Sequence, residues 1–405
     1  MRPTTLALAA AVALCACGRD DTALPLAPMP DAALAAQGGH GPAAVADGQT
    51  IFRYDTFGDE TFWTDTLRMH EVIRTAVSPA TALSVGLKVD ADALPAAVKA
   101  GIANGSIDLN APATTVALLG LNAVVGVVGQ VDAGGTLQRV GITCALCHTQ
   151  VDNSFAPGIG RRLDGWPNRD LNVGAIVALS PALTPAQKAV YGSWGPGMYD
   201  PRFNIDGKNT PIVIPPAFGL RHVALETYTG DGPVSYWNAY VAITQMHGHG
   251  IFSDPRIGVS VSNPPDLVSS KLDALRAYQL SLDAPEPKAG SFDAEAARRG
   301  RAVFTGEAKC VRCHLGGAFT DVNAGRLHDP AEVGQDPAYA LRTATKLYRT
   351  TPLRGLWNPP QLRGPYFHDG SAKTLDAVVA HYEARFGLSL TDRQRRDLVE
   401  YLKTL

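Results

Sequence analysis

Two copies of the motif Cys-x-x-Cys-His constrain this chain more than any other feature of its 405 residues. One copy spans 144–148 and the other 310–314. Two cysteines three positions apart lie side by side on one helical turn. Both can form thioether bonds to the vinyl groups of one haem, while the adjacent histidine binds its iron. The sequence therefore predicts two covalently bound haem c groups, attached at Cys144, Cys147, Cys310 and Cys313, with proximal iron ligands His148 and His314.

A zinc site and a redox-active thiol pair are the alternative uses of a Cys-x-x-Cys pair. A single zinc site would need all four cysteines together. The motifs, however, lie 166 positions apart (310 minus 144), and each carries histidine at the same offset. The two remaining cysteines, Cys15 and Cys17, lie in the N-terminal segment. No pair is left for a structural disulfide, so the haem interpretation is favoured.

The composition suits small, loop-rich haem domains. The formal net charge is −2 and no long block of like charge occurs, which argues against nucleic acid as a partner. The chain holds 40 glycines and 29 prolines, so turns should be frequent and regular elements short. A bound haem would supply much of the apolar core of such a domain.

The N-terminal segment is typical of bacterial export. Residues 1–17 combine a short basic start with an apolar, alanine-rich middle that is too short to span a bilayer. Leu14–Cys17 resembles a lipobox, which predicts lipidation of Cys17; the alternative is an ordinary signal cleaved nearby. Residues 18–49 are expected to form a flexible tether. We expect Gram-negative-type export to the periplasm, with membrane contact only through a lipid anchor in the outer or inner membrane.

The segment that follows each haem motif is repeated. Residues 210–232 and 351–370 both run from Thr-Pro through a proline-rich turn and an aromatic residue to Asp-Gly. Apolar residues at helical spacing follow each, and each half ends on a similar amphipathic segment, 275–282 or 398–405. We therefore expect a mainly α, loop-rich fold with two cytochrome c-like haem domains. One covers 50–285, including an N-terminal extension, and the other covers 291–405.

The repeat breaks where a second iron ligand would lie. Counted from each Asp-Gly, His381 of the second half corresponds to Ile243 of the first, and isoleucine cannot bind iron. We expect His381 to be the sixth ligand of the second haem. Just beyond Ile243 the first half has a cluster of other candidates: Gln245, Met246, His247 and His249. The first haem either takes a ligand from this cluster or keeps an open position that can bind peroxide or oxygen.

The chain resembles the di-haem cytochrome c peroxidase superfamily, which includes the di-haem maturase of methylamine dehydrogenase. The resemblance is strongest over 300–405, where 351–354 (Thr-Pro-Leu-Arg) and 365–370 (Pro-Tyr-Phe-His-Asp-Gly) follow a haem motif. It is weaker over 141–282, and 49–139 matches nothing in the peroxidase core. The resemblance implies that the N-terminal haem is the reaction site and the C-terminal haem the site of electron entry.

For the first haem, the resemblance implies a glutamine and a glutamate on the distal side. Peroxide cleavage needs a base and a polar group there. The nearest candidates are Gln245 and His247, with Glu226 just before the first Asp-Gly. The expected downstream glutamate is absent, because its segment offers only Asp254.

For the second haem, relatives usually have methionine as the sixth ligand, but the matching region here has none. Histidine ligation should lower the reduction potential relative to methionine. The maturase has tyrosine at about this place, so Tyr382 is a rival to His381, and His328 is another.

The resemblance also implies two accessory sites. One is a tryptophan that relays electrons between the haems, for which Trp194 and Trp166 are candidates; the alternative is that each packs in a core. The other is a calcium ion held partly by backbone carbonyls, for which those of Thr351 and Pro352 are the candidates.

These observations predict a di-haem oxidoreductase that reduces hydrogen peroxide, or another small oxidant, at the first haem. Electrons would come through the second haem from a small donor protein, a cytochrome c or a cupredoxin. One alternative is a di-haem oxidase that acts on an organic or protein substrate. The other is a di-haem electron carrier, in which both irons have two protein ligands.

Overall fold

The computed structural model describes residues 41–357, 359, 362 and 364–405. The predicted signal segment and lipid anchor at Cys17 lie outside these residues, as do residues 18–40 of the predicted tether. The prediction of a flexible tether is wrong for residues 42–49, which form the first turns of a helix that packs on the rest of the protein. Helices joined by long loops dominate the described part, and its strands form two-stranded sheets. Within the same part, no helix is long and apolar enough to cross a membrane. The expectation of a mainly helical, loop-rich fold is confirmed.

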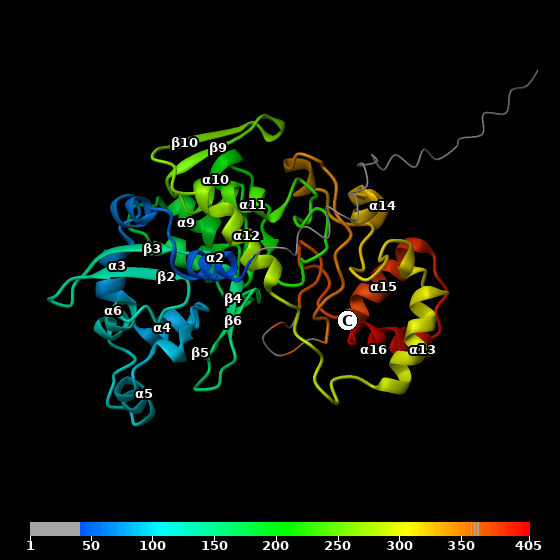
Figure 1. Cartoon of the computed structure of the whole chain (residues 1–405), viewed down its shortest axis with the longest axis horizontal. Coiled ribbons are helices and arrows are strands. Elements are labelled where there is room, and N and C mark those ends of the chain that lie inside the picture. The colour runs from blue at the N-terminus through cyan, green and yellow to red at the C-terminus, as the bar shows by residue number, and fades with distance from the viewer. Residues whose placement is uncertain (1–40, 358, 360–361, 363) are drawn as a thin grey trace, which may run out of the picture.

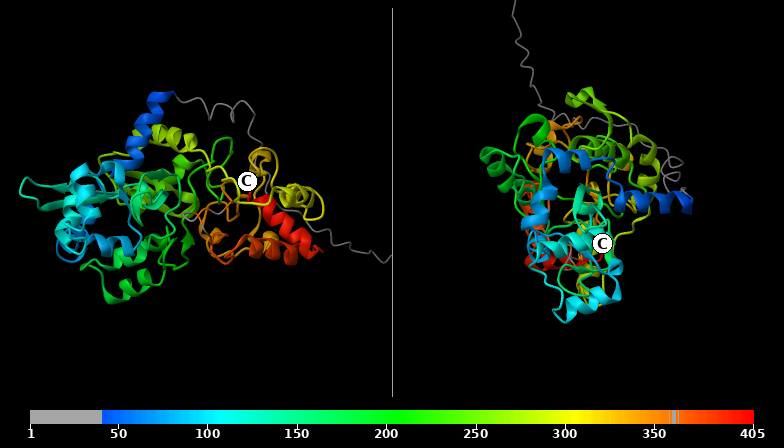
Figure 2. Two further views of the ribbon diagram at one scale, coloured as in Figure 1. Left: turned by 90° about the horizontal axis from the view of Figure 1, so that it is seen from below. Right: turned by 90° about the vertical axis from the view of Figure 1, so that its left-hand side faces the viewer.

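The predicted N-terminal extension forms one end of the molecule (Figures 1 and 2). Proline occupies the first turn of α2, α4 and α6, where its missing N–H group costs no hydrogen bond. The elements are α2 (Pro42–Tyr54), α3 (Met69–Ala76), α4 (Pro79–Ser84), α5 (Ala96–Ala103), α6 (Pro112–Gly120), and the antiparallel strands β2 (Val127–Val131) and β3 (Leu137–Ile142).

The extension packs tightly on the first haem region. Helix α2 lies along α12 (Leu272–Ser281), and a Cβ atom at Gly48 would lie 2.0 Å from the Ala274 carbonyl oxygen. The rings of Phe52 and Tyr278 meet edge to face in the same contact, with centroids 5.5 Å apart. A side chain at position 48 would therefore push the two helices apart.

The first haem region begins with the motif helix α7 (Ala145–His148). The helix expected after the first Asp-Gly is confirmed as α11 (Val234–Tyr240), which continues into a π-helical turn, η3 (Val241–Gln245). The other elements are β4 (Thr149–Val151), β6 (Arg162–Asp164), α8 (Val173–Ala178), α9 (Pro185–Gly192), β7 (Met198–Tyr199), α10 (Phe203–Asp206), β8 (Ile212–Val213), β9 (Gly250–Asp254) and β10 (Val259–Asn263). Strand β1 (Val89–Asp90) of the extension pairs with β5 (Ile159–Gly160).

The C-terminal half is built on α13 (Ala294–Thr305), α14 (Pro330–Val333), α15 (Leu375–Phe386) and α16 (Asp392–Leu402). Helix α13 begins directly after Asp293, because the Asp293 carboxylate accepts the backbone N–H groups of Glu295 and Ala296. It crosses α16 so closely that a Cβ atom at Gly300 would lie 1.9 Å from the Asp397 carbonyl oxygen. These helices form the end opposite the extension (Figure 1).

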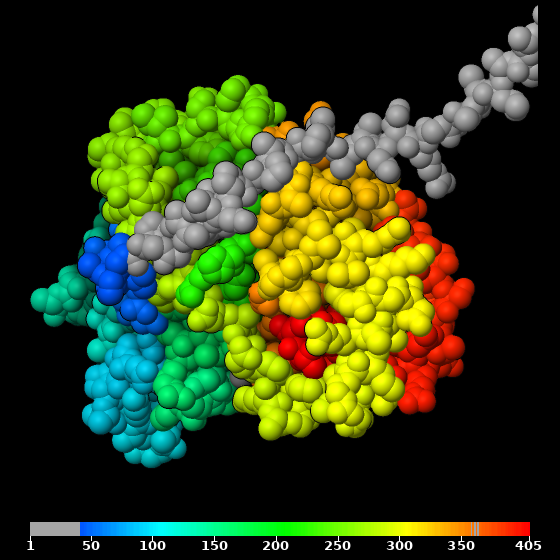
Figure 3. Space-filling view, turned by 45° about the vertical axis from the view of Figure 1, so that its right-hand side comes forward, coloured from blue at the N-terminus to red at the C-terminus, as the bar shows by residue number. Residues whose placement is uncertain are grey.

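The two repeated segments meet where the halves join. The backbone N–H of Val213 donates to the His368 carbonyl oxygen at 2.7 Å. The Phe218 ring lies 3.1 Å from a Cβ atom built at Gly355. Figure 3 shows the second half, yellow to red, in direct contact with green segments of the first half on this face. The regions that follow the two motifs are thus brought side by side.

Candidate haem site

One cavity of about 1790 Å³ reaches both Cys-x-x-Cys-His motifs. A pocket for one drug-sized ligand is roughly 300–1,000 Å³, so this cavity has room for more than one such group. Most of the side chains on its wall are apolar. The motif residues on the wall are Cys144, Cys147, His148, Cys310, Cys313 and His314.

The two motif histidines are oriented in the same way. His148 Nδ1 lies 3.1 Å from the Pro215 carbonyl oxygen, and His314 Nδ1 lies 3.0 Å from the Phe319 carbonyl oxygen. A carbonyl accepts, so Nδ1 carries the proton and Nε2 keeps its lone pair. Burial lowers the pKa of His148 to about 4, and burial also lowers the pKa of His314. Both rings are therefore neutral at pH 7, which is the form that binds a metal.

The four motif thiols are protonated in this environment. Burial raises the pKa of Cys144 and of Cys147 to about 12. It raises the pKa of Cys310 to about 12 and that of Cys313 to about 11. Thiolates are the form that binds zinc, so this burial gives no support to a zinc site.

Two buried arginines on the cavity wall are suited to bind the propionates of a haem. Arg169 and Arg349 both line the cavity, and burial lowers the pKa of each to about 10. Arg349 donates to three backbone carbonyls, and Arg169 donates to the Pro365 carbonyl while its Nε has no acceptor among the described residues. Neither forms an ion pair with a carboxylate in that part of the chain. Haem propionates are carboxylates that would pair with buried guanidinium groups, so the wall fits the cofactor.

The candidates for the sixth ligand of the second haem separate clearly. Tyr382 lines the cavity, and burial raises its pKa to about 12. His381 turns away, since its Nε2 lies 2.9 Å from the Val333 carbonyl oxygen and its ring is not on the cavity wall. The geometry therefore does not favour the prediction of His381 as a ligand. The His381 ring points toward α14 instead.

His328 lines the cavity, but both of its ring nitrogens are engaged. Nε2 lies 2.9 Å from Asp321 Oδ2, and Nδ1 lies 3.1 Å from Glu332 Oε1. Burial lowers the pKa of His328, but the hydrogen bonds and charges of Asp321 and Glu332 outweigh it and raise the pKa overall. An imidazole with a hydrogen bond at each ring nitrogen has no lone pair free for iron, so His328 is also disfavoured as the sixth ligand.

On the first-haem side, Gln245 is held by its neighbours. Its Oε1 accepts from the Tyr199 hydroxyl at 2.6 Å, and its Nε2 donates to Asn204 Oδ1 at 2.8 Å. All three side chains line the cavity. Tyr199 comes from β7 and Asn204 from α10, so elements distant from η3 fix the amide in place. Such an amide can direct a hydrogen bond at a group bound on the distal side.

The other two distal candidates, His247 and Glu226, differ in whether their polar groups are engaged by other side chains. His247 stacks on Phe62 with ring centroids 3.6 Å apart, and burial lowers its pKa to about 4. At this pKa the ring is neutral at pH 7 and can act as a base. It lies on the cavity wall, with its Nε2 3.4 Å from Asn204 Nδ2. Glu226 also lines the cavity, but it pairs with Arg276 and accepts the Val234 N–H at 2.9 Å. The Glu226 carboxylate is therefore engaged in structural contacts.

The remaining predicted residues lie in several places. Trp194 lines the cavity beside Tyr199 and donates to Asn209 Oδ1 at 2.8 Å. Trp166 packs against Phe218 and is not on the wall. His249 is also off the wall and is bonded to the Pro264 carbonyl. Thr351 and Pro352, proposed for calcium, line the same cavity as His314.

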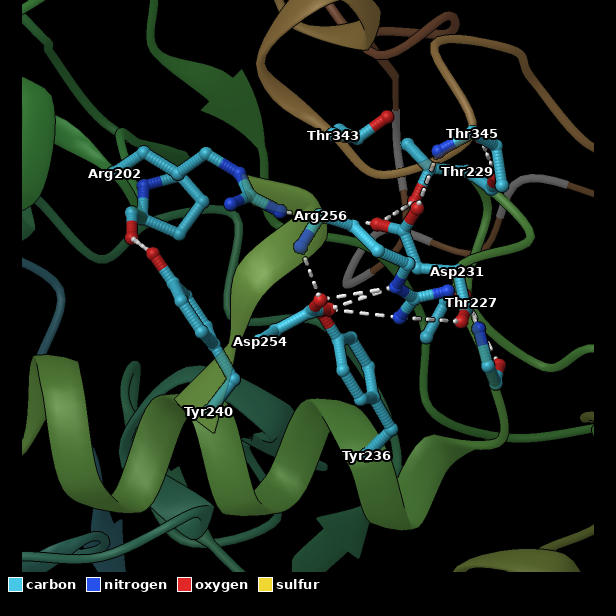
Figure 4. A network of polar contacts seen from close by, with 12 residues as sticks. Arg202, Thr227, Thr229, Asp231, Tyr236, Tyr240, Asp254, Arg256, Thr343 and Thr345 are labelled. Atoms are coloured by element: carbon cyan, nitrogen blue, oxygen red, sulfur yellow. Dashed lines mark hydrogen bonds and ion pairs between the residues drawn. The ribbon is translucent and has the colours of Figure 1, made fainter. Parts of the chain in front are cut away.

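A polar network ties the halves together close to the cavity (Figure 4). The Arg202 guanidinium lies over the rings of Tyr240 and Tyr339, 5.1 and 5.8 Å from their centroids, and 3.7 Å from Asp231. Asp231, the acid of the first Asp-Gly, accepts the Thr345 N–H of the second half at 3.1 Å. The repeated Asp-Gly thus serves the contact between halves.

Sequence reasoning missed Arg169, Arg349 and Tyr199. No motif marks them. A usable signal for Arg349 was its place just before the second Thr-Pro, the segment that lines the cavity beside the second motif. Arg169, in a loop after the first motif, and Tyr199, in β7, carry no comparable signal.

The family model described as cytochrome c matches residues 297–405. Methylamine utilization protein MauG of Methylorubrum extorquens is 37% identical over 127 residues, which cover 27% of this chain and 34% of that protein. Cytochrome-c peroxidase IdrP1 of Denitromonas iodatirespirans is 31% identical over 150 residues, covering 27% of this chain and 40% of that protein. The chain thus spans between a third and two fifths of the length of these relatives.

Among solved structures, the hydrazine synthase of Kuenenia stuttgartiensis aligns with 48% of this chain and 73% of its own, at 21% identity and a TM-score of 0.31. That score is too low to establish a common overall fold. The sequence relationships are stronger. The chain carries a cytochrome c domain at residues 297–405 and is a relative of the oxidoreductases named MauG and cytochrome-c peroxidase.

Proposed function

We propose that the chain is a di-haem c-type cytochrome that reduces hydrogen peroxide at the haem of the first motif. Electrons would arrive through the haem of the second motif. The observation that carries this proposal is the single cavity onto which both motif histidines present a free Nε2. When bound, the haems would supply the redox chemistry. His148 and His314 would be their proximal ligands.

The residues on the first-haem side suit the handling of peroxide. Tyr199 and Asn204 hold the Gln245 amide. His247 is neutral and can accept a proton. Apolar walls and stacked aromatic rings limit the access of water. We assign positioning of peroxide to Gln245 and proton transfer to His247. Glu226 is held by Arg276, so it has no part in this chemistry.

On the second-haem side we propose Tyr382 as the sixth ligand, in place of His381. Tyr382 is the residue of the two that lines the cavity. With both axial positions filled by protein, this haem would transfer electrons rather than bind peroxide. A small cytochrome c or cupredoxin would donate to it. Export to the periplasm, a lipid anchor at Cys17 and a calcium ion near Thr351 and Pro352 belong to the same proposal.

The second candidate function is electron transfer without catalysis. Met246 favours it, because this buried residue of the Gln245–His249 cluster lines the cavity and could bind the first iron. Both irons would then have two protein ligands in every redox state.

Electron paramagnetic resonance of the holoprotein separates the two candidates. Oxidised and half-reduced samples are recorded with and without cyanide. A high-spin ferric signal that cyanide converts to low spin identifies an open haem, and peroxide turnover with a reduced cytochrome c then measures the activity. Two low-spin haems that ignore cyanide in both redox states would contradict the peroxidase proposal and leave the electron carrier. Gln245→Ala should lower turnover more than ten-fold, and Gln138→Ala on the exposed hairpin is the control.

A further inference from the structure

The wall of the haem cavity includes residues of the N-terminal extension. There its wall comes from α3, α4, α6 and the segments that follow them, which lie together at one end of the molecule (Figures 1 and 2). We call this part the annex and define it by Ile73, Val77, Ala82, Thr115, Leu119 and Val124. None of these side chains is charged, and all but Thr115 are apolar.

The annex is lined by other residues than those that pack on the attachment helix of the first motif. The first haem is tied to α7, where Leu146 packs with Leu171 and Ile214. Leu119 and Val124 belong instead to a separate core cluster built around the extension. Residues 69–124 all precede the motif, and the motif itself supplies no side chain to that cluster. We use the word chamber for this part of the haem cavity, whose wall meets that of the first motif at Val127, Ile142 and Ile176.

One polar atom in this chamber has no partner. Thr115 is 5% exposed, its side chain lines the cavity, and its hydroxyl makes no hydrogen bond with any described residue. The neighbouring Thr114 differs, because its hydroxyl donates to the Asp108 carbonyl at 2.7 Å. A buried hydroxyl without a partner costs stability, and a group that fills the chamber and bonds to it would recover this cost.

The chamber has an apolar approach from the surface. Leu179, at the end of α8, lines the cavity and is 41% exposed. Leu183 and Ile176 continue the wall inward and pack in the same cluster as Ile73. An uncharged molecule can follow this route without meeting a charged side chain of this set.

We propose that the annex binds a small, uncharged organic molecule that carries one hydroxyl or carbonyl group. Its apolar body lies against Ile73, Ala82 and Leu119. Its oxygen bonds to the Thr115 hydroxyl, which can donate or accept. Charged ligands are excluded, because no charged group is present in the annex to compensate their loss of water. The bound molecule would lie next to the first haem in a continuous cavity. Binding does not require peroxide turnover.

Calorimetric titration of the oxidised holoprotein tests this site with three probes that share one ring: benzyl alcohol, toluene and benzoate. Benzyl alcohol and toluene should bind, and benzoate should not. Thr115→Val should weaken the binding of benzyl alcohol about ten-fold, which is the net effect of one hydrogen bond, and leave the affinity for toluene unchanged. Thr114→Val, one position along the same helix, should change neither. Ala82→Leu adds side-chain volume inside the annex and should abolish the binding of both.

Several results would overturn the proposal. Wild-type protein that binds none of the probes, or benzoate that binds as tightly as benzyl alcohol, excludes an uncharged-ligand site. Unchanged binding of benzyl alcohol in Thr115→Val or Ala82→Leu places the ligand elsewhere. A changed haem spectrum in ligand-free Thr115→Val assigns the hydroxyl to the haem. The spectrum and the peroxide turnover of each variant are recorded separately, so failure of the peroxidase proposal leaves this test intact.

Discussion

His381 and Tyr382 are consecutive on α15, yet their rings stand at 83° to each other and face different surroundings. Tyr382 lines the haem cavity, whereas His381 forms a hydrogen bond with the carbonyl of Val333, the last residue of α14. Adjacent residues on a helix point about 100° apart, so both cannot reach one metal on the same face. The fold, rather than ligand chemistry, decides between them.

Tyr382→Phe should therefore alter the second haem. The substitution keeps the ring and removes the oxygen, so one low-spin ferric signal should become high spin in electron paramagnetic resonance. His381→Gln should leave that signal as it is. Tyr401→Phe, on the neighbouring helix α16 and off the cavity wall, is the matched control. A spin change in His381→Gln with none in Tyr382→Phe would restore the histidine as the ligand.

Removal of the buried Arg169 cation should lower a haem reduction potential. A positive charge beside a haem favours the reduced iron, which carries one positive charge less. We expect Arg169→Gln to shift one midpoint by about 30–60 mV, since 59 mV corresponds to a tenfold change for one electron. Spectroelectrochemical titration measures the shift. Arg298→Gln, an exposed residue of α13 paired with Glu295, should leave both midpoints unchanged. A rise in potential would show that Arg169 does not act as a cation near the haem.

Much of the architecture follows from the sequence, because its signals are local. The Cys-x-x-Cys-His spacing places six residues on one cavity wall, and the Asp293 cap and apolar spacing mark α13, α15 and α16. The ligand question is not local. His381 matches the repeat by position, but only the packing of α15 against α14 shows which way it turns. The same holds for Arg169, whose isolation from carboxylates depends on how the two halves meet.

Asp59 should make the protein less stable as pH rises. It is fully buried beneath β3, where burial raises its pKa from 3.8 to about 9. Between these values the folded state holds a proton that the unfolded state has lost, so the free energy of unfolding falls with increasing pH. Asp59→Asn has no such proton. At pH 7 it should be more stable than the wild type by up to about 4 kcal/mol, from roughly three pKa units of 1.36 kcal/mol each.

Denaturant unfolding at pH 4.5, 7 and 8.5 measures this effect. The advantage of Asp59→Asn should be small at pH 4.5 and grow toward pH 8.5. Asp65→Asn, the control, alters an exposed carboxylate paired with Arg139. Its free energy of unfolding should stay within about 0.5 kcal/mol of the wild-type value at each pH. If Asp59→Asn is equally destabilised at all three pH values, the carboxyl group is required for its shape or bonding rather than carrying a raised pKa.

Arg342 should hold the two halves together. It reaches from the second half to Asp200 and Asp206 of the first, with distances of 3.0 and 2.7 Å, and the side chains of Arg342 and Asp200 are almost fully buried. Arg342→Met leaves the Asp200 carboxylate buried without its partner, which costs about 3–5 kcal/mol. The midpoint of denaturant unfolding should fall accordingly. Arg395→Met, which breaks a half-exposed pair with Glu383, should cost about 0–1 kcal/mol.

A second substitution distinguishes a lost ion pair from lost packing. Asp200→Asn removes the charge that Arg342→Met leaves unpaired, so the double variant should recover a large part of the loss. The coupling energy from the four proteins then measures the pair itself. If the double variant is as unstable as the sum of the single ones, the charges do not interact. The interface would then depend on the Arg202–Asp231 network and on apolar contacts such as Phe218 against Gly355.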